Sequence, residues 1–290
     1  MVMLLGSDVR TKEVLGWRGV HLFHFGGSSC SQKVRIFLHL KRIDWVSHPV
    51  NLARREQTTP YYMGINPRGL VPTLVHDGQV VIESNDIIEY LEERFPDPVL
   101  IPRDSAERMH ELLREEDDLH LDLRALTMRF IVPSFLAKKS EREIAAYESL
   151  GSGTVLGRAD PNRLREIHFW RGMNAHDGIT DARACAAVAN FRARFDRFDQ
   201  DLANRRYLLG NELTVLDIGW YIYARRLRDA SYPLRRLHPR FGRWFDELDA
   251  RPGFRREVRS PALLRLLTRS LHVAQRARGT TLAKLAGLGS

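Results

Sequence analysis

The first residues that could do chemistry together lie at positions 26–35, Gly-Gly-Ser-Ser-Cys-Ser-Gln-Lys-Val-Arg. This run places hydroxyls and a thiol between a predicted strand and the start of a predicted helix. Unpaired N–H groups and peptide dipoles at a helix start stabilise a thiolate or a carboxylate. A hydroxyl that donates to sulfur lowers a thiol pKa that starts at about 8.5. Ser28 is the first candidate for that hydroxyl and Ser29 the second, whereas Cys30 is a candidate nucleophile in its own right.

Two further segments lie at junctions of predicted elements. Residues 66–72, Asn-Pro-Arg-Gly-Leu-Val-Pro, place Pro72 at the first position of a strand, where Val71 keeps its backbone groups free to pair with something else. An X-Pro bond is also the common place for a cis peptide. Glu83 and Ser84 follow at a strand-to-helix junction, where a hydroxyl and helix N–H groups can hold a carboxylate.

Short β-branched runs and amphipathic stretches alternate up to residue 95, and they must position these segments. Asp77-Gly78, between two β-branched runs, is the strongest hairpin signal in the chain. Parallel strands need crossover helices, so the order β-α-β-α-β-β-α predicts a mixed four-stranded sheet with helices packed against it. We expect strands at Val20–Phe25, Trp45–Val50, Thr73–His76 and Gln79–Ile82, and helices at Ser29–Lys41, Arg54–Ile65 and Ser84–Arg94.

Beyond residue 95 the spacing of apolar residues is helical. Residues from Met109 to Phe130 predict one long helix, and the capping-box variant at Thr214–Asp217 predicts the start of a buried one. The fold class is therefore α/β plus all-α. We expect an N-terminal extension at 1–17, domains at 18–95 and 104–260 joined by a linker at 96–103, an irregular insertion near 151–180, and a C-terminal helix at 261–290.

Charge and composition limit the function classes. The formal net charge is +9, but residues 251–290 hold nine basic side chains and one acidic one, so most of the excess belongs to an amphipathic tail. We expect this tail to dock on the second domain rather than on nucleic acid or a membrane. Two distant cysteines and the absence of ligand spacing among the histidines predict neither a disulfide framework nor a metal. The apolar runs are too short for a membrane span and the first residues lack a secretory pattern, so we expect a soluble, cytoplasmic protein.

Residues 20–95 resemble the thioredoxin-like domain of the cytosolic glutathione S-transferases. The pattern Ser28-Ser-Cys-Ser-x-x-Val-Arg-Ile followed by Asn66-Pro-x-x-x-Val-Pro-Thr-Leu74 is similar to the zeta class in particular. The helical remainder is similar to that family's second domain, while its length and the insertion resemble longer bacterial members, including the lignin β-etherases. The resemblance implies a thioredoxin-like N-terminal domain, an all-helical C-terminal domain and glutathione as cosubstrate.

The resemblance also implies which residues hold glutathione. Ser84 with its helix N–H groups would take the γ-glutamyl carboxylate, and Glu83 would take the ammonium. Val71, before a cis Pro72, would pair its backbone with the cysteinyl unit like an added strand. Gln57 stands where the zeta pattern has a glutamine that reaches the glycyl end.

Three hydroxyl or thiol groups remain open for the chemical step. Ser28, or Ser29 after a shift of one position, would ionise the glutathione thiol, whereas Cys30 would form a mixed disulfide with glutathione. Lys33 occupies the fourth position of the thioredoxin-type spacing, so no resolving thiol is present and a dithiol oxidoreductase is not expected.

The expected function is activation of the glutathione thiol for attack on a small hydrophobic, aromatic electrophile. The electrophile is expected between the domains, beside Leu119, Leu123, Arg124 and Thr127. The alternatives are β-aryl ether cleavage, zeta-like isomerisation, reductive dehalogenation through Cys30, and a non-catalytic interaction protein on the same scaffold. The family usually forms dimers, so a homodimer is expected and a heterodimer is an alternative.

Overall fold

The computed structural model describes residues 1–133, 138–258 and 262–289, and the side chains of all of these except 262–264. The chain forms two compact units. Unit 1 comprises residues 1–98 and 139–175, and unit 2 comprises residues 99–138 and 176–290. The division differs from the expected one, because residues 139–175 pack with the N-terminal unit and not within the helical domain that we expected at 104–260.

Unit 1 is built on a mixed sheet of five strands in the order β1-β5-β4-β2-β3. Strands β2 and β3 are parallel, and the other neighbours are antiparallel. The sheet has one strand more than expected, because the N-terminal extension adds β1, whose Val2 pairs with Ile82. The strands are β1 (Val2–Met3), β2 (Val20–His24), β3 (Val46–Pro49), β4 (Thr73–His76) and β5 (Gln79–Ile82).

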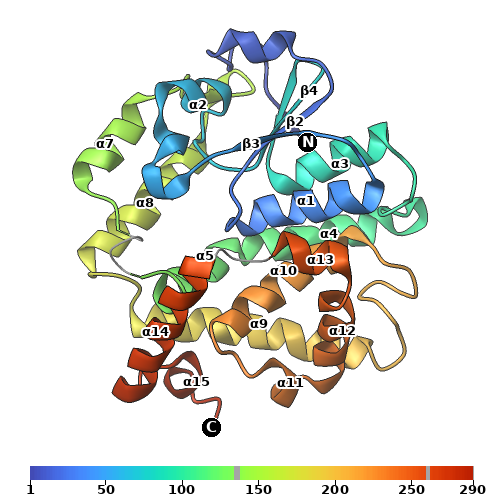
Figure 1. Cartoon of the computed structure of the whole chain (residues 1–290), viewed down its shortest axis with the longest axis vertical. Coiled ribbons are helices and arrows are strands. Elements are labelled where there is room, and N and C mark those ends of the chain that lie inside the picture. Colours follow the sequence, from blue (N-terminus) through green and yellow to red (C-terminus); the bar gives the residue numbers. More distant parts are fainter. Residues whose placement is uncertain (134–137, 259–261, 290) are drawn as a thin grey trace. The chain divides into compact units, whose positions relative to one another are not determined.

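Helices α1 (Ser29–Lys41) and α3 (Ser84–Arg94) have the predicted bounds and lie together beside the sheet (Figure 1). The single helix expected at Arg54–Ile65 is wrong. The chain instead forms two 3-10 turns, η2 (Leu52–Arg54) and η3 (Glu56–Thr58), and then α2 (Pro60–Ile65). Arg55, at φ 60°, interrupts the helical path, and Pro60 starts a new helix because its missing N–H is not needed there.

A hydrophobic core on the sheet combines three separate parts of unit 1. Strand residues such as Phe23, Val75 and Ile82 pack with the N-terminal extension, with α2 and with Val155 of the 139–175 segment. The extension carries the 3-10 turn η1 (Lys12–Gly16), whose Val14 is fully buried. Burial of this kind stabilises by about 25 cal/mol per Å² of apolar surface, so the extension and the segment are structural parts of the unit.

The segment 139–175 contains α7 (Glu141–Ser149), a small hairpin of β6 (Thr154–Val155) and β7 (Arg158–Ala159), and α8 (Pro161–Ala175) (Figure 1). A capping box between Ser140 and Glu143 starts α7. The fully buried Asp8 fixes the hairpin, because its Oδ1 accepts from Thr154 Oγ1 at 2.8 Å and from Gly157 N at 3.1 Å.

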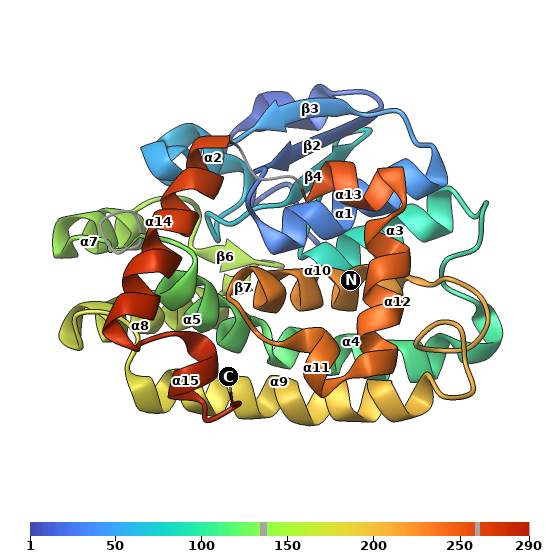
Figure 2. The same ribbon diagram turned by 60° about the horizontal axis from the view of Figure 1, so that its bottom comes forward.

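Unit 2 is helical throughout its described part (Figure 2). The long helix predicted from Met109 to Phe130 is divided at Leu119, whose N–H donates to the carbonyl of Glu116, three residues back. The helices are η4 (Arg103–Ser105), α4 (Ala106–Asp118), α5 (His120–Phe130), α9 (Asp181–Asp201), α10 (Val215–Asp229), α11 (Leu234–Leu237), α12 (Pro239–Asp249), α13 (Pro252–Glu257), α14 (Ala262–Arg278) and α15 (Leu282–Leu285).

The start of α10 is held by the buried carboxylate of Asp217. Its Oδ2 accepts from the N–H of Thr214 at 3.0 Å and from the hydroxyl of Thr214 at 3.1 Å. Its Oδ1 accepts from Leu208 N at 3.0 Å and from Trp244 Nε1 at 2.9 Å. The carboxylate thus joins the loop before α10 to α12, and α10 packs against α4, α5 and α12.

The basic tail lies on unit 2, where α14 covers the end of α5. Thr268 Oγ1 donates to the carbonyl of Ile131 at 3.2 Å, and His272 Nε2 is 3.0 Å from the carbonyl of Phe130. Terminal carbonyls of a helix lack partners within the helix, so these contacts satisfy them. Within the described residues, no helix combines the length and hydrophobicity that a membrane span requires.

Replacing Asp217 by Ala should lower the free energy of unfolding by about 3 kcal/mol, because four buried donors would lose their acceptor. Urea unfolding measures the change. Glu212→Ala, in the exposed loop before α10, is the matched control and should change the free energy by less than about 0.5 kcal/mol. Equal effects of the two substitutions would contradict this account of α10.

The fully buried His238 should make unit 2 sensitive to acid. Burial lowers the pKa of His238 from its ordinary value of 6.5, and this outweighs the nearby carboxylates of Asp196 and Asp199. Between the two pKa values the unfolded chain binds the proton and the folded chain does not, so stability is present above about pH 6.5 and falls as the pH falls. The midpoint of thermal unfolding should therefore fall more between pH 7.5 and about pH 5.5 in the wild-type chain than in His238→Gln. Parallel pH profiles would show that His238 does not cause the effect.

Candidate functional site

The loop of residues 66–72 is fixed by hydrogen bonds from its own neighbours. Asn66 Nδ2 donates to the carbonyl of Leu70 at 3.0 Å and to Thr73 Oγ1 at 2.9 Å. Tyr62, which is 3% exposed, donates its hydroxyl to the same carbonyl at 2.5 Å. The loop ends in a cis peptide bond between Val71 and Pro72, as expected. These contacts hold the backbone of Val71 in one position.

Ser28 and Val71, which lie far apart in the sequence, meet at the start of α1. Ser28 is the N-cap residue, and its Oγ accepts from the N–H of Ser31 at 3.3 Å. The same hydroxyl donates to the carbonyl of Val71 at 3.5 Å. Ser29 and Cys30 form the first turn of α1, and all three side chains are half-buried. Among the hydrogen bonds of the described residues none uses the N–H of Val71, so this donor is free to pair with a ligand.

Gln57 lies in η3 beside the same loop. A Cβ at Gly69, which has φ +58°, would come within 3.0 Å of the carbonyl of Gln57 and within 2.6 Å of Met63 Sδ, so the loop passes too closely for any side chain. The side chain of Gln57 is buried, and its Oε1 has no hydrogen-bond partner among the described residues. A buried unpaired amide oxygen costs about 1–3 kcal/mol, and a ligand donor would remove that cost.

Glu83 and Ser84 begin α3. Glu83 has φ 69° and ψ 127°, a conformation that costs a residue with a side chain about 1–3 kcal/mol and that clusters at ligand-binding positions. Ser84 is 5% exposed and is the first residue of the helix, whose N–H groups are directed toward its start. The side chain of Glu83 is 41% exposed and forms an ion pair with Arg68.

Arg68 joins this end of α3 to the 139–175 segment. Its Nε and Nη2 donate to the two oxygens of Asp160 at 2.8 and 2.9 Å, and its Nη1 donates to Glu83. Tyr147 donates its hydroxyl to the carbonyl of Arg68 at 2.6 Å. Burial would lower the pKa of Arg68, but the hydrogen bonds and charges of Asp160 and Glu83 outweigh it and raise that pKa.

The structure therefore brings most of the sequence-predicted residues of unit 1 to one place. The 66–72 loop contacts each of the other elements. Val71 contacts Ser28 at the start of α1, Gly69 lies beside Gln57 in η3, and Arg68 pairs with Glu83 at the start of α3. Sequence reasoning missed Arg68, Asp160 and Tyr147. Arg68 lies inside the 66–72 motif, where a charge between two prolines could have been noticed, but no spacing indicates Asp160, which is 92 residues away.

The residues expected to contact an electrophile lie in unit 2. Leu123 is 1% exposed in the core, and Thr127 Oγ1 donates to the carbonyl of Leu123 at 2.7 Å within the same helix. Leu119 joins α4 to α5, and Arg124 is half-buried beside His120. None of the four lines the cleft that is described in this unit. No three His, Cys, Asp or Glu side chains within the described ranges come together as metal ligands.

Replacing Asp160 by Asn should remove the bidentate ion pair and leave the buried guanidinium of Arg68 with Glu83 alone. Breaking one partner of a buried pair costs about 3 kcal/mol of unfolding free energy, whereas an exposed pair contributes about 0.5 kcal/mol. Glu111→Gln, which breaks the exposed pair with Arg108, is the control. Chemical denaturation should separate the two variants, and equal stability losses would contradict the structural role of Asp160.

Two family models match the chain. A model of the glutathione S-transferase N-terminal domain matches residues 27–94, and a model of the C-terminal domain matches residues 154–247. A glutathione S-transferase 1 of Dianthus caryophyllus is 45% identical over 89 residues, which are 31% of this chain and 40% of the relative. A maleylacetoacetate isomerase of Pseudomonas aeruginosa is 46% identical over 93 residues, which are 31% of this chain and 44% of the relative. The chain thus spans about two fifths of the length of these curated relatives.

Solved structures share the fold across both units. The β-etherase LigF of Sphingobium sp. strain SYK-6 has a TM-score of 0.69 at 24% identity, covering 82% of this chain and 98% of that one. A maleylpyruvate isomerase of the zeta class has a TM-score of 0.57 at 24% identity, covering 82% of this chain and 95% of that one. The two family models together match more than half of the 290 residues, and the fold agrees with both. The chain belongs to the cytosolic glutathione S-transferase superfamily.

Proposed function

We propose that this chain is an enzyme that binds glutathione in unit 1 and activates its thiol for attack on a small electrophile. The observation that carries the proposal is the position of Ser28, whose hydroxyl caps α1 and lies 3.5 Å from the carbonyl of Val71. The hydroxyl has one proton, so donation to a sulfur at this position would replace its 3.5 Å bond to the Val71 carbonyl, and the α1 dipole favours a thiolate there. Both effects lower the thiol pKa.

The backbone of Val71 and the amide of Gln57 fit a peptide-like ligand. The N–H and carbonyl of Val71 would pair with the cysteinyl unit as an added strand does, because neither belongs to a strand of the sheet. The buried Oε1 of Gln57 would accept from the amide N–H of the glycyl unit. An unpaired buried oxygen and an unused backbone donor at one loop are both satisfied by an extended peptide.

Glu83 and Ser84 fit the γ-glutamyl end, which carries both charges. The hydroxyl of Ser84 and the first N–H groups of α3 would hold the carboxylate. The ion pair with Arg68 does not cancel the role of Glu83, because Arg68 is shared with Asp160. One guanidinium and two carboxylates leave a net charge of −1, which attracts an ammonium group.

The identity of the electrophile rests on different observations. The 46% identity over 93 residues with a maleylacetoacetate isomerase favours glutathione-dependent isomerisation as the second candidate reaction. We also keep β-aryl ether cleavage as a candidate reaction, because the length of the chain resembles that of the lignin β-etherases. In general we propose a small hydrophobic, aromatic electrophile. We also propose a cytoplasmic homodimer, as is usual in the family.

Ser28→Ala should lower turnover with glutathione by about 100-fold, because one hydrogen bond to developing or existing negative charge is lost. The pKa of the bound thiol, measured by the ultraviolet absorbance of the thiolate, should rise toward its ordinary value of about 8.5. Ser29→Ala and Cys30→Ala are the matched controls on the same helical turn and should keep turnover and thiol pKa. Loss of turnover in Cys30→Ala alone would assign the reaction to a mixed disulfide at Cys30.

A non-catalytic protein on the same scaffold would behave differently. The wild-type chain should be retained on immobilised glutathione and should consume thiol with a chloronitroaromatic electrophile, an aryl ether or a maleyl-type acid. Thioether or isomer products are identified by mass spectrometry. A chain that is not retained and consumes no thiol with any of these compounds would contradict the enzyme proposal.

A further inference from the structure

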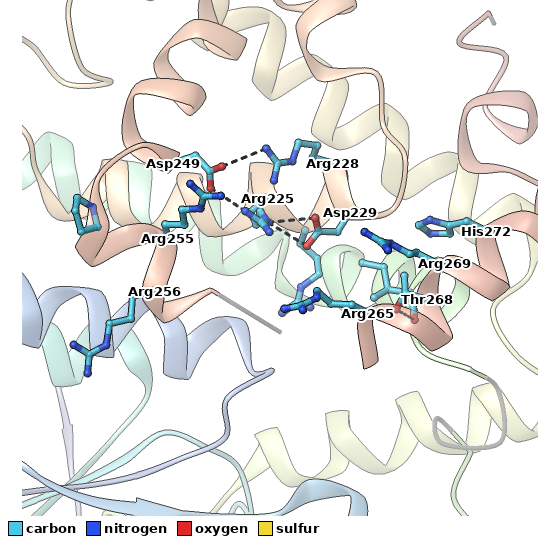
Figure 3. A pocket seen from close by; sticks show the side chains of 13 residues that line it. Arg225, Arg228, Asp229, Asp249, Arg255, Arg256, Arg265, Thr268, Arg269 and His272 are labelled. Carbon is cyan, nitrogen blue, oxygen red and sulfur yellow. Dashed lines mark hydrogen bonds and ion pairs between the residues drawn. The ribbon is translucent and has the colours of Figure 1, made fainter. Parts of the chain in front are cut away.

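Unit 2 contains a cleft of about 920 Å³ that is lined mainly by arginines (Figure 3). Seven arginines line it, three from α10, two from α13 and two from α14. The cleft also contains His272, whose ring is held against the carbonyl of Phe130. A volume of this size is in the range of sites for small molecules, which is about 300–1,000 Å³.

The acidic residues of the cleft are already paired. Asp249 lies 2.8 Å from Arg225 and 3.6 Å from Arg228, and Asp229 lies 3.2 Å from Arg225. Asp229 and Asp249 are the only carboxylates among the described lining residues. Both carboxylates therefore pair with arginines of α10. The lining as a whole has five more cationic than anionic side chains.

Two of the cations on the other walls have no such partner. Within the part of the chain that the structure describes, neither Arg255 on α13 nor Arg269 on α14 has an ion pair, and both are exposed. Figure 3 shows Arg255 and Arg269 on either side of the Arg225–Asp229 pair. Like charges around a concave surface repel one another, and an anion bound between them removes that repulsion.

The chemistry of the walls defines the ligand further. Guanidinium groups bind carboxylates and phosphates through two parallel hydrogen bonds. Ile131 and Pro252 add apolar surface to the same cleft, which suits a carbon skeleton better than an inorganic ion. Two separated, unpaired arginines suit a ligand with two acidic groups.

We propose that this cleft binds a small organic dicarboxylate, which is held by the excess positive charge of the lining and in particular by the unpaired Arg255 and Arg269. The proposal does not depend on the glutathione reaction, because it concerns residues of unit 2 and is tested by binding alone.

Calorimetric titration of the full chain with phthalate, benzoate and inorganic phosphate at low salt tests the proposal. Phthalate should bind saturably and at least about tenfold more tightly than benzoate, because its second carboxylate adds a second negative charge in a cleft whose lining has five excess cations. Salt should weaken the binding, since Arg255 and Arg269 are exposed. Phosphate that binds more tightly than phthalate would overturn the dicarboxylate assignment, and so would a wild-type chain that binds none of the three.

Variants assign the binding to the two arginines. Arg255→Ala/Arg269→Ala should weaken phthalate binding at least about tenfold, and the corresponding double lysine variant should bind with intermediate affinity, because lysine keeps the charge and loses the fork. Arg276→Ala/Arg278→Ala removes two exposed charges from the end of α14, outside the cleft, and should bind phthalate as the wild type does. Equal affinity of the Arg255/Arg269 alanine variant and the wild type would overturn the proposal, with thermal unfolding showing that each variant is folded.

Glutathione itself carries two carboxylates, so the phthalate titration is repeated with saturating glutathione. Unchanged phthalate affinity supports a separate site in unit 2. Loss of phthalate binding would overturn the proposal, because the dicarboxylate would then occupy the glutathione site. Ser28→Ala should leave phthalate affinity unchanged whether or not it alters turnover, so failure of this proposal and failure of the proposed function remain distinguishable.

Discussion

The buried guanidinium of Arg68 is the constraint on which unit 1 depends. Its side chain is 7% exposed, and a charge so far from water must be neutralised where it lies. Asp160 supplies both of its oxygens from the 139–175 segment, and Glu83 supplies a third contact from the start of α3. One side chain thus fixes three segments that are distant in the sequence. In the function that we propose, the net negative charge of this network attracts the ammonium group of glutathione.

The remaining geometry of the candidate site follows from the loop that carries Arg68. Asn66 and Tyr62 both donate to the Leu70 carbonyl of this loop, and Gly69 allows the loop to pass close to Gln57. The loop places the backbone of Val71 beside Ser28 at the start of α1. The binding groups that we propose therefore come from the backbone and from helix ends, and the serine hydroxyl is the group that we propose acts on the thiol.

The sequence predicts those elements of unit 1 whose structure depends on a short local pattern. Asp77-Gly78 forms the expected hairpin, and the bounds of α1 and α3 agree with their sequence patterns. Other features have no local signal. The two-residue strand β1 is too short for an alternating pattern, and the positive φ of Arg55 divides a helix that periodicity favours. The pairing of Arg68 with Asp160 depends on how a segment 92 residues away packs, which spacing does not reveal. Apolar periodicity marks Leu123 as buried but does not separate a helix core from a ligand site.

The tail has two roles in unit 2. Polar side chains of α14 satisfy the last carbonyls of α5, and its arginines face the cleft. The central claim nevertheless concerns unit 1, and a crystal structure of the full chain with glutathione tests it most directly. We predict the thiol within hydrogen-bond distance of Ser28 Oγ, the cysteinyl backbone paired with Val71, and the glycyl end at Gln57 Oε1. Glutathione bound away from Val71, or with its sulfur bonded to Cys30, would contradict the account.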